Sequence, residues 1–331
     1  MQKAACRAVT FIDVVASLTV VALLFAAIVP LLKRCGDVTR EQRENGAAKI
    51  LSRALTSYTL DNNDALVVAH PNWGWVHAST SIPPNPVMQP LDPYNSTRRL
   101  TGTIAKTYMS HLASDGRIKP QEMQVDPATA AAFAARSTQP ATISPPNLAD
   151  FSSTSAQAGV LWHPSLGYNG VFIGGSYRHG AFSGPNGLSN EQYGGAFYLQ
   201  RLSQAVAPSR LIAFVTARGG DVGSGQWWSF GASAPNSGQV HPGYWLVTPP
   251  RTGLLPNGGT WHGTLNVFDS VRVPGTWGNV DCRAGSSKAL VAQLDGSNQT
   301  LALESLRDMR RWANQATGPN WQWTPGQNAA P

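Results

Sequence analysis

Apolar residues form one long run near the start of the chain, and the pattern becomes amphipathic soon after it. The run covers residues 9–32, with Asp13 and Pro30 as its irregular positions. A helix of this length spans about 36 Å, which exceeds the hydrocarbon thickness of a bilayer, about 30 Å. A secretory signal peptide has an apolar core of only about 7–15 residues, followed by a small-residue cleavage site. We therefore expect a membrane-spanning helix over residues 9–33 that is retained in the protein.

Beyond the run, apolar residues recur at spacings of three and four, which predicts an amphipathic helix. These residues are Val38, Ile50, Leu51, Ala54, Leu55 and Tyr58. The helix is expected to continue through residues 34–60 and to end at residues 61–64, Asp-Asn-Asn-Asp, because short polar side chains favour turns. Such a stripe packs on the chain's own sheet far more often than on a partner, and we expect the same here.

Short apolar segments separated by Gly, Pro and Asn turns dominate from about residue 159, and this spacing predicts an antiparallel sheet. Strands are expected at 211–216, 288–294 and 299–303, among others, and a closing helix at 304–314. Asp295 and Gly296 predict a tight hairpin between the last two strands, because this dipeptide tolerates positive φ angles. The predicted fold class is α+β, with the long N-terminal helix packed on the antiparallel β-sheet of a globular domain at 61–331.

Composition and charge narrow the class of protein. Charged residues make up 13% of the 331 residues, about half of the usual share, which argues against a coiled coil or a charged disordered chain. The net charge is +7, and residues 1–60 account for +4 of it. The remaining 271 residues carry no dense basic patch, so no nucleic-acid partner is expected.

The residue types that catalyse reactions or bind metals are scattered. The seven histidines never adopt the spacing of a zinc hydrolase, and the glycine clusters match no nucleotide-binding or nucleophile motif. Residues 61–64 depart from the EF-hand pattern at Ala65, so a calcium ion is conceivable but no motif supports it. We expect no enzymatic activity and no cofactor.

Three cysteines are too few for a disulfide framework and lack a metal-binding spacing. Cys35 and Cys282 either pair in an oxidising compartment or remain two free thiols. The sequence leaves both arrangements open.

The residues Ala8-Val9-Thr10-Phe11-Ile12-Asp13 resemble the prepilin cleavage and methylation box, Gly-Phe-Thr-Leu-Ile-Glu, in the same frame. Pro30 is the 22nd residue counted from Val9, a position where pilins and pseudopilins commonly carry proline. The resemblance implies that prepilin peptidase cuts after Ala8 and that Val9 becomes N-methylated. It also implies that Asp13 neutralises the terminal amine of a neighbouring subunit. Ala8, Val9 and Asp13 stand where the family usually has Gly, Phe and Glu.

A second resemblance, to large pseudopilin-like proteins with a C-terminal Asp-Gly box, involves residues 47–58 and the predicted hairpin. The matching positions are Lys49, Ala54, Leu55, Tyr58, Asp295 and Gly296. That family has a histidine ten residues before the aspartate, and this chain has Gly285 there. A role tied to that histidine is therefore not carried over, and Asp295 is expected to be a turn residue.

Together the resemblances imply a type IV pilin-like or type II secretion pseudopilin-like structural subunit. It would consist of a leader at 1–8, a transmembrane helix at 9–33, an amphipathic continuation at 34–60 and an extracytoplasmic domain at 61–331. Its implied location is the inner (cytoplasmic) membrane, single-pass, with a cytoplasmic N-terminus. Its implied partners are prepilin peptidase, other pilin or pseudopilin subunits and the lipid bilayer.

The 11 tryptophans leave a second function open. Exposed tryptophans stack on sugar rings, so the chain is alternatively a signal-anchored cell-surface protein whose Trp-rich β domain binds carbohydrate. Packing in the core is the commoner use of tryptophan. A third class is an anchored hydrolase with an unrecognised site.

Overall fold

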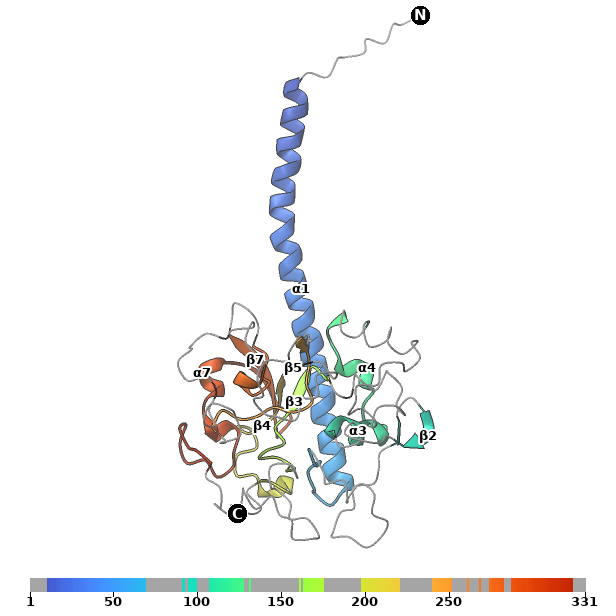
Figure 1. The fold of residues 1–331 in the computed structure, drawn as a ribbon, viewed down its shortest axis with the longest axis vertical. Helices are drawn as coiled ribbons and strands as arrows, with labels where there is room; N and C mark the ends of the chain where they lie inside the picture. The colour runs from blue at the N-terminus through green and yellow to red at the C-terminus, as the bar shows by residue number, and fades with distance from the viewer. Residues whose placement is uncertain are drawn as a thin grey trace, which may run out of the picture. The chain divides into compact units, whose positions relative to one another are not determined.

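The structure, a computed structural model of the chain, describes part of its 331 residues. The described ranges are 11–69, 91–92, 95–99, 107–127, 131, 161, 163–175, 198–220, 240–251, 261, 268, 274–282 and 287–323. Contacts between Cα atoms divide the chain into two units, Met1–Arg43 and Glu44–Pro331. Helix α1 (Phe11–Asp61) contributes residues to both units (Figure 1).

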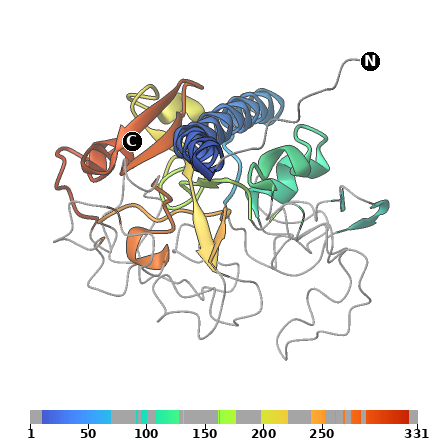
Figure 2. The same ribbon diagram turned by 90° about the horizontal axis from the view of Figure 1, so that it is seen from above.

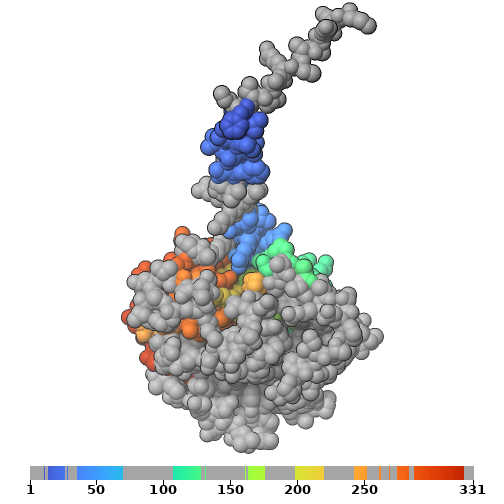
Figure 3. All heavy atoms as spheres, turned by 45° about the horizontal axis from the view of Figure 1, so that its top comes forward, coloured from blue at the N-terminus to red at the C-terminus, as the bar shows by residue number. Residues whose placement is uncertain are grey.

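The first unit is helical from Phe11 and exposes its apolar side chains. The large apolar side chains between Phe11 and Ile28 that the structure describes have exposed fractions from 42% to 83%, and they are dark blue in Figure 3. They are Phe11, Val14, Val15, Leu18, Val20, Val21, Leu23, Leu24, Phe25 and Ile28. Among the residues that the structure describes, we find no helix with the length and apolar character needed to span a bilayer.

In the second unit, α1 buries one face in the core. The buried side chains are mostly small and recur at helical spacing: Ala47, Ala48, Leu51, Ala54 and Leu55. Val38, expected on this stripe, is instead 54% exposed and lies outside the unit that forms the core. The helix ends at Asp61 as predicted, and the turn after it has positive φ at Asn63 (53°) and Asp64 (69°). Asn and Asp adopt this left-handed conformation more readily than most residues.

Four antiparallel strands form the main sheet, in the order β3-β4-β7-β8. They are β3 (Leu166–Tyr168), β4 (Ile212–Thr216), β7 (Lys288–Gln293) and β8 (Asn298–Ala302). The central strand β4 is buried along its whole length, and Phe214 lies opposite Ala292 of β7. The predicted combination of helices with an antiparallel sheet is confirmed, as are the strands expected at 211–216, 288–294 and 299–303.

Shorter elements surround the sheet and α1. They are β1 (Leu91–Asp92), β2 (Asn95–Arg99), α3 (Tyr108–Ser114), α4 (Pro120–Met123), η5 (Leu202–Gln204), β5 (Arg218–Gly220), β6 (Val240–Pro242) and η7 (Pro274–Trp277). In the second unit, α3 and α4 lie on one side of α1 and the four-stranded sheet lies on the other (Figures 1 and 2). The elements after residue 159 include six of the eight described strands.

The prediction of a single closing helix at 304–314 is wrong. The chain forms α7 (Leu303–Leu306) and then the separate 3₁₀ helix η8 (Met309–Arg311). Asp308 starts the second helix, because its carboxylate accepts a hydrogen bond from the backbone N–H of Arg310 (3.0 Å). The break also places Trp312 in the core, where its Nε1 donates to the carbonyl of Leu306 (2.7 Å).

Buried side-chain hydrogen bonds join segments that are distant in the sequence. Asn169 follows β3, and its Nδ2 donates to the carbonyls of Ile212 (3.0 Å) and Trp312 (2.9 Å). The hydroxyl of Tyr168 donates to the carbonyl of Val67, at 3.1 Å. Asn169 therefore connects β3, the start of β4 and the C-terminal segment.

We expect Asn169→Ala to lower the free energy of unfolding by about 2–3 kcal/mol, because it leaves the carbonyls of Ile212 and Trp312 buried without a donor. Urea unfolding of the purified chain in detergent, followed by tryptophan fluorescence, measures the change. Gln121→Ala, at an exposed position of α4, is the control and should change it by less than about 0.5 kcal/mol. Equal losses in the two variants would show that the bonds of Asn169 are dispensable.

Candidate functional site

The residues of the prepilin-like motif lie at the limit of the described chain. Ala8 and Val9 are outside the described residues. Asp13 and Pro30 lie within α1, and their side chains are outside the description. Cleavage, methylation and the roles of Asp13 and Pro30 in assembly therefore stay predictions.

Asp295 and Gly296 lie in the turn between β7 and β8. Gly296 has a φ of 88°, a conformation that other residues adopt only with strain. The Asp295 carboxylate accepts hydrogen bonds from the backbone N–H of Ser297 (2.9 Å) and from its hydroxyl (2.6 Å). These bonds give Asp295 a local role in the turn.

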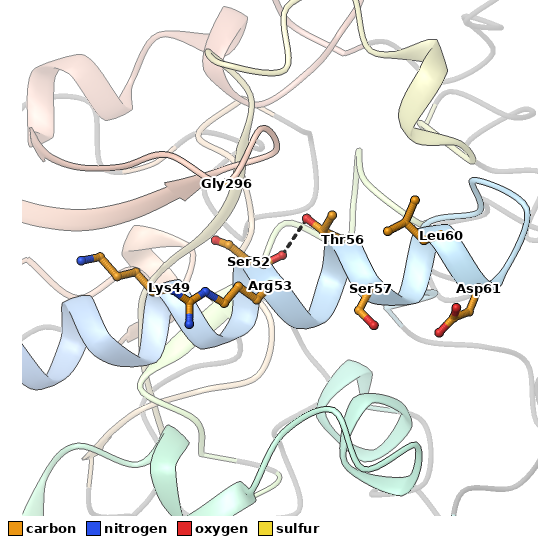
Figure 4. Close-up of a pocket in the computed structure, with 8 residues that line it drawn as sticks. All are labelled: Lys49, Ser52, Arg53, Thr56, Ser57, Leu60, Asp61 and Gly296. Carbon is orange, nitrogen blue, oxygen red and sulfur yellow. Dashed lines mark hydrogen bonds between the residues drawn. The ribbon is translucent and has the colours of Figure 1, made fainter.

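A groove of about 530 Å³ runs along the exposed face of α1 beside this turn. It is lined by Lys49, Ser52, Arg53, Thr56, Ser57, Leu60, Asp61 and Gly296. Figure 4 shows Lys49 and Arg53 at one end of the stretch and Leu60 and Asp61 at the other. All the lining residues except Gly296 come from α1, so the groove is a surface of this helix bordered by the β7–β8 hairpin.

The two ends of the groove differ in their charge pairing. Lys49 and Arg53 are exposed, and within the described chain neither makes an ion pair or a side-chain hydrogen bond. At the opposite end, Asp61 forms an ion pair with Arg117 Nη2 at 2.8 Å. The groove is therefore cationic at one end and has an ion-paired carboxylate at the other.

Arg117 fixes the end of α1 to the loop between α3 and α4. Besides Asp61, its guanidinium donates to the hydroxyl of Ser57 and to the carboxylate of Asp115 (3.4 Å). It also lies 5.7 Å from the centre of the Tyr58 ring. Burial raises the pKa of Tyr58, with a smaller contribution from the charge of Asp115. No local sequence pattern signals this set of contacts, because Arg117 is distant in sequence from its partners on α1.

The two histidines whose side chains the structure describes are both buried. His163 is buried, with Nδ1 2.9 Å from the carbonyl of Gly243. His111 on α3 is buried too, and burial lowers its pKa from 6.5 to about 4. Within the described ranges, no three His, Cys, Asp or Glu side chains gather as a metal site would require.

The described tryptophans lie mostly in the core. The buried ones are Trp245, Trp261, Trp277, Trp312 and Trp323. Trp321 is partly buried and packs edge-on against Phe172, with 6.1 Å between ring centres. A carbohydrate site would have to use the partly exposed Trp321 or tryptophans outside the described residues, such as Trp73, Trp75, Trp227 and Trp228.

Cys282 is a buried free thiol. Burial, helped by the nearby Asp281 charge, raises its pKa to about 12, so it is protonated and unreactive at neutral pH. The side chain of Cys35 is outside the described residues.

Comparison with known proteins finds no family model, no curated protein and no solved structure that matches the chain. The assignment of a function therefore depends on the residues of this chain.

The buried His111 predicts that stability falls in mild acid. His111 takes up a proton near pH 6.5 in the unfolded chain and only near pH 4 in the folded chain. The free energy of unfolding therefore keeps its full value above pH 6.5 and decreases as the pH falls from 6.5 toward 4, because the unfolded state then binds more protons. The free energy of unfolding falls by at most about 3 kcal/mol through this histidine. Urea unfolding at pH values of about 7 and about 4.5 should show a smaller loss in His111→Leu, which cannot titrate. The same loss in parent and variant would assign the acid sensitivity to other groups.

Proposed function

We propose that the chain is a structural subunit of a type IV pilus-like or type II secretion pseudopilus-like assembly, anchored in a membrane by its N-terminal helix. The observation that carries the proposal is the character of α1. Its stretch from Phe11 to Ile28 exposes large apolar side chains, whereas its stretch from Ala47 to Leu55 is part of a folded core. We propose a structural role for the chain and propose no catalysed reaction.

The exposed apolar stretch needs apolar surroundings. Covering one Leu, Val, Ile or Phe side chain contributes about 1.5–3 kcal/mol, and ten such described side chains are exposed between Phe11 and Ile28. Two polar side chains of the same stretch bond to the helix itself: Ser17 Oγ donates to the Val14 carbonyl (2.8 Å) and Thr19 Oγ1 to the Ala16 carbonyl (2.8 Å). Lipid chains and the helices of other copies both supply the surroundings that such a surface requires.

The prepilin-like motif assigns roles to the first residues. Prepilin peptidase would remove residues 1–8 and methylate Val9, and the Asp13 carboxylate would pair with the Val9 amine of a neighbouring copy. Pro30 would loosen the helix in the membrane, because proline removes one backbone hydrogen bond. The N-terminus would be cytoplasmic in the inner membrane, and the second unit would lie in the periplasm or outside the cell.

Processing is the first test of this proposal. In a host with prepilin peptidase, the mature chain should begin at N-methylated Val9 and contain 323 of the 331 residues. Intact-mass measurement decides the matter, and a peptidase-deficient host is the control, where residues 1–8 should remain. A chain that begins at Met1 in both hosts, or that is cut beyond residue 25, would contradict the proposal.

Asp13→Ala should insert into the membrane but fail to assemble. Removal of the carboxylate lifts an insertion cost of about 2.5–3.5 kcal/mol for the isolated helix. It also leaves the Val9 amine of a neighbour buried without a partner, at a cost of several kcal/mol. The monomer therefore gains stability and the assembly loses it.

Asp13→Glu keeps the charge and should assemble, whereas Asp13→Asn keeps the shape without the charge and should behave like Asp13→Ala. Cross-linking between copies in membranes compares the variants, and membrane fractionation confirms that each is inserted. If Asp13→Ala cross-links as well as the parent, the carboxylate has no part in assembly and the proposal loses its main physical basis.

A further inference from the structure

The chain contains two Asp-Gly dipeptides, Asp115–Gly116 at the end of α3 and Asp295–Gly296 in the β7–β8 turn. In such a dipeptide the backbone nitrogen of the glycine can attack the side-chain carboxyl of the aspartate, because glycine has no side chain to obstruct the approach. Both glycines have positive φ, 70° at Gly116 and 88° at Gly296. The two dipeptides share this local chemistry, so a difference in their reactivity has to come from their folded surroundings.

The two aspartate carboxylates are held to different degrees. The carboxylate of Asp295 accepts hydrogen bonds from the backbone N–H of Ser297 (2.9 Å) and from its hydroxyl (2.6 Å). The carboxylate of Asp115 lies 3.4 Å from Nε of Arg117, the long limit of a hydrogen bond, and no backbone N–H of the described residues donates to it. The Asp115 side chain is also 41% exposed. It therefore turns toward the next backbone nitrogen more easily than the side chain of Asp295 does.

The backbone is also easier to rearrange at Asp115. This residue caps the C-terminus of α3, where the N–H of Gly116 donates to the carbonyl of Ala113 (3.0 Å). The last turn of a helix frays at low cost. A Cβ placed on Gly116 would meet no other described part of the chain within 4 Å, so the reacting atoms have space. The turn at Asp295 instead joins two paired strands of the main sheet, β7 and β8.

We propose that Asp115–Gly116 is a modification site, at which the folded chain forms isoaspartate without an enzyme, and that Ser297 protects Asp295 from the same reaction. The Gly116 nitrogen attacks the carboxyl carbon of Asp115, a C–N bond forms, and the carboxyl hydroxyl leaves with the amide proton as water. Water then opens the resulting succinimide ring at either of its carbonyls. One opening restores aspartate, and the other gives isoaspartate, in which the backbone continues through the former side chain.

The modification bears on Arg117, the residue that follows Gly116. The contacts of Arg117 with Ser57 and Asp61 of α1 form the Arg117 clamp. Isoaspartate adds a methylene group to the backbone just before Arg117, so its guanidinium should lose its position against α1. The inference does not depend on the proposed function, because both dipeptides lie in the second unit.

Long incubation of the purified full chain in detergent at neutral pH tests the assignment. Peptide mapping by mass spectrometry separates isoaspartate from aspartate at each site, and it distinguishes deamidated asparagines because only they change in mass. Isoaspartate should accumulate about fivefold faster at Asp115 than at Asp295, which corresponds to about 1 kcal/mol, the usual worth of one hydrogen bond. In guanidinium chloride, which removes the fold, the two rates should become similar. An equal or faster rate at Asp295 in the folded chain, or an unchanged ratio in denaturant, would overturn the inference.

Substitution of Ser297 tests its protective role. Ser297→Ala removes the hydroxyl donor and should raise the rate at Asp295 by about fivefold, with no change at Asp115. Ser297→Thr keeps the hydroxyl and should keep the low rate. A rate at Asp295 that does not respond to Ser297→Ala would overturn this role.

Hydrogen exchange measures the effect on the Arg117 clamp. Amides of residues 57–61 should exchange faster in incubated chains that carry isoaspartate at position 115 than in fresh chains. Asp115→Glu is the matched control, because it keeps the carboxylate but would need a larger ring that forms much more slowly, so incubation should leave its exchange unchanged. Arg117→Gln should show the faster exchange without incubation. Unchanged exchange in the isoaspartate form would overturn the effect on the clamp.

Discussion

The small side chains on the buried face of α1 set how closely the rest of the second unit packs on this helix. Ala47, Ala48 and Ala54 add little bulk between the helix axis and the core. The β7–β8 hairpin lies in contact range of the helix, since a Cβ on Gly296 would be 3.9 Å from the Cβ of Ser52, an ordinary van der Waals distance. The sheet, the hairpin and the groove beside it all depend on this close packing, since a larger side chain on the buried face would displace them together.

The two segments of α1 differ in what surrounds them. The segment in the second unit buries its apolar face in the chain's own core and has polar side chains on the outside. The segment in the first unit has apolar side chains outside, and among the residues of that unit that the structure describes, none covers them. The proposed subunit would share its apolar segment with lipid and with other copies, and this sharing would resolve the contrast.

Local signals made part of the fold predictable from the sequence. The end of α1 at Asp61 and the hairpin at Asp295 were found because the amphipathic period and the turn residues are encoded within a few positions. The break in the closing helix was missed, because it depends on Asp308 capping a second helix and on the burial of Trp312. The clamp of Arg117 was missed for a similar reason: its partners come together only after the chain has folded.

The clamp of Arg117 also has a mechanical meaning. Any filament subunit held at its N-terminal helix and pulled through its domain transmits tension along α1. Inside the second unit, that tension acts as shear between α1 and the elements packed on it, and Arg117 is anchored to the last turns through Ser57 and Asp61. Under shear, the contacts between α1 and the elements packed on it carry the force together and must break together. Under peeling, the force acts on one end of the helix, and the contacts break one after another. By holding the last turns against the α3–α4 loop, Arg117 opposes peeling from that end.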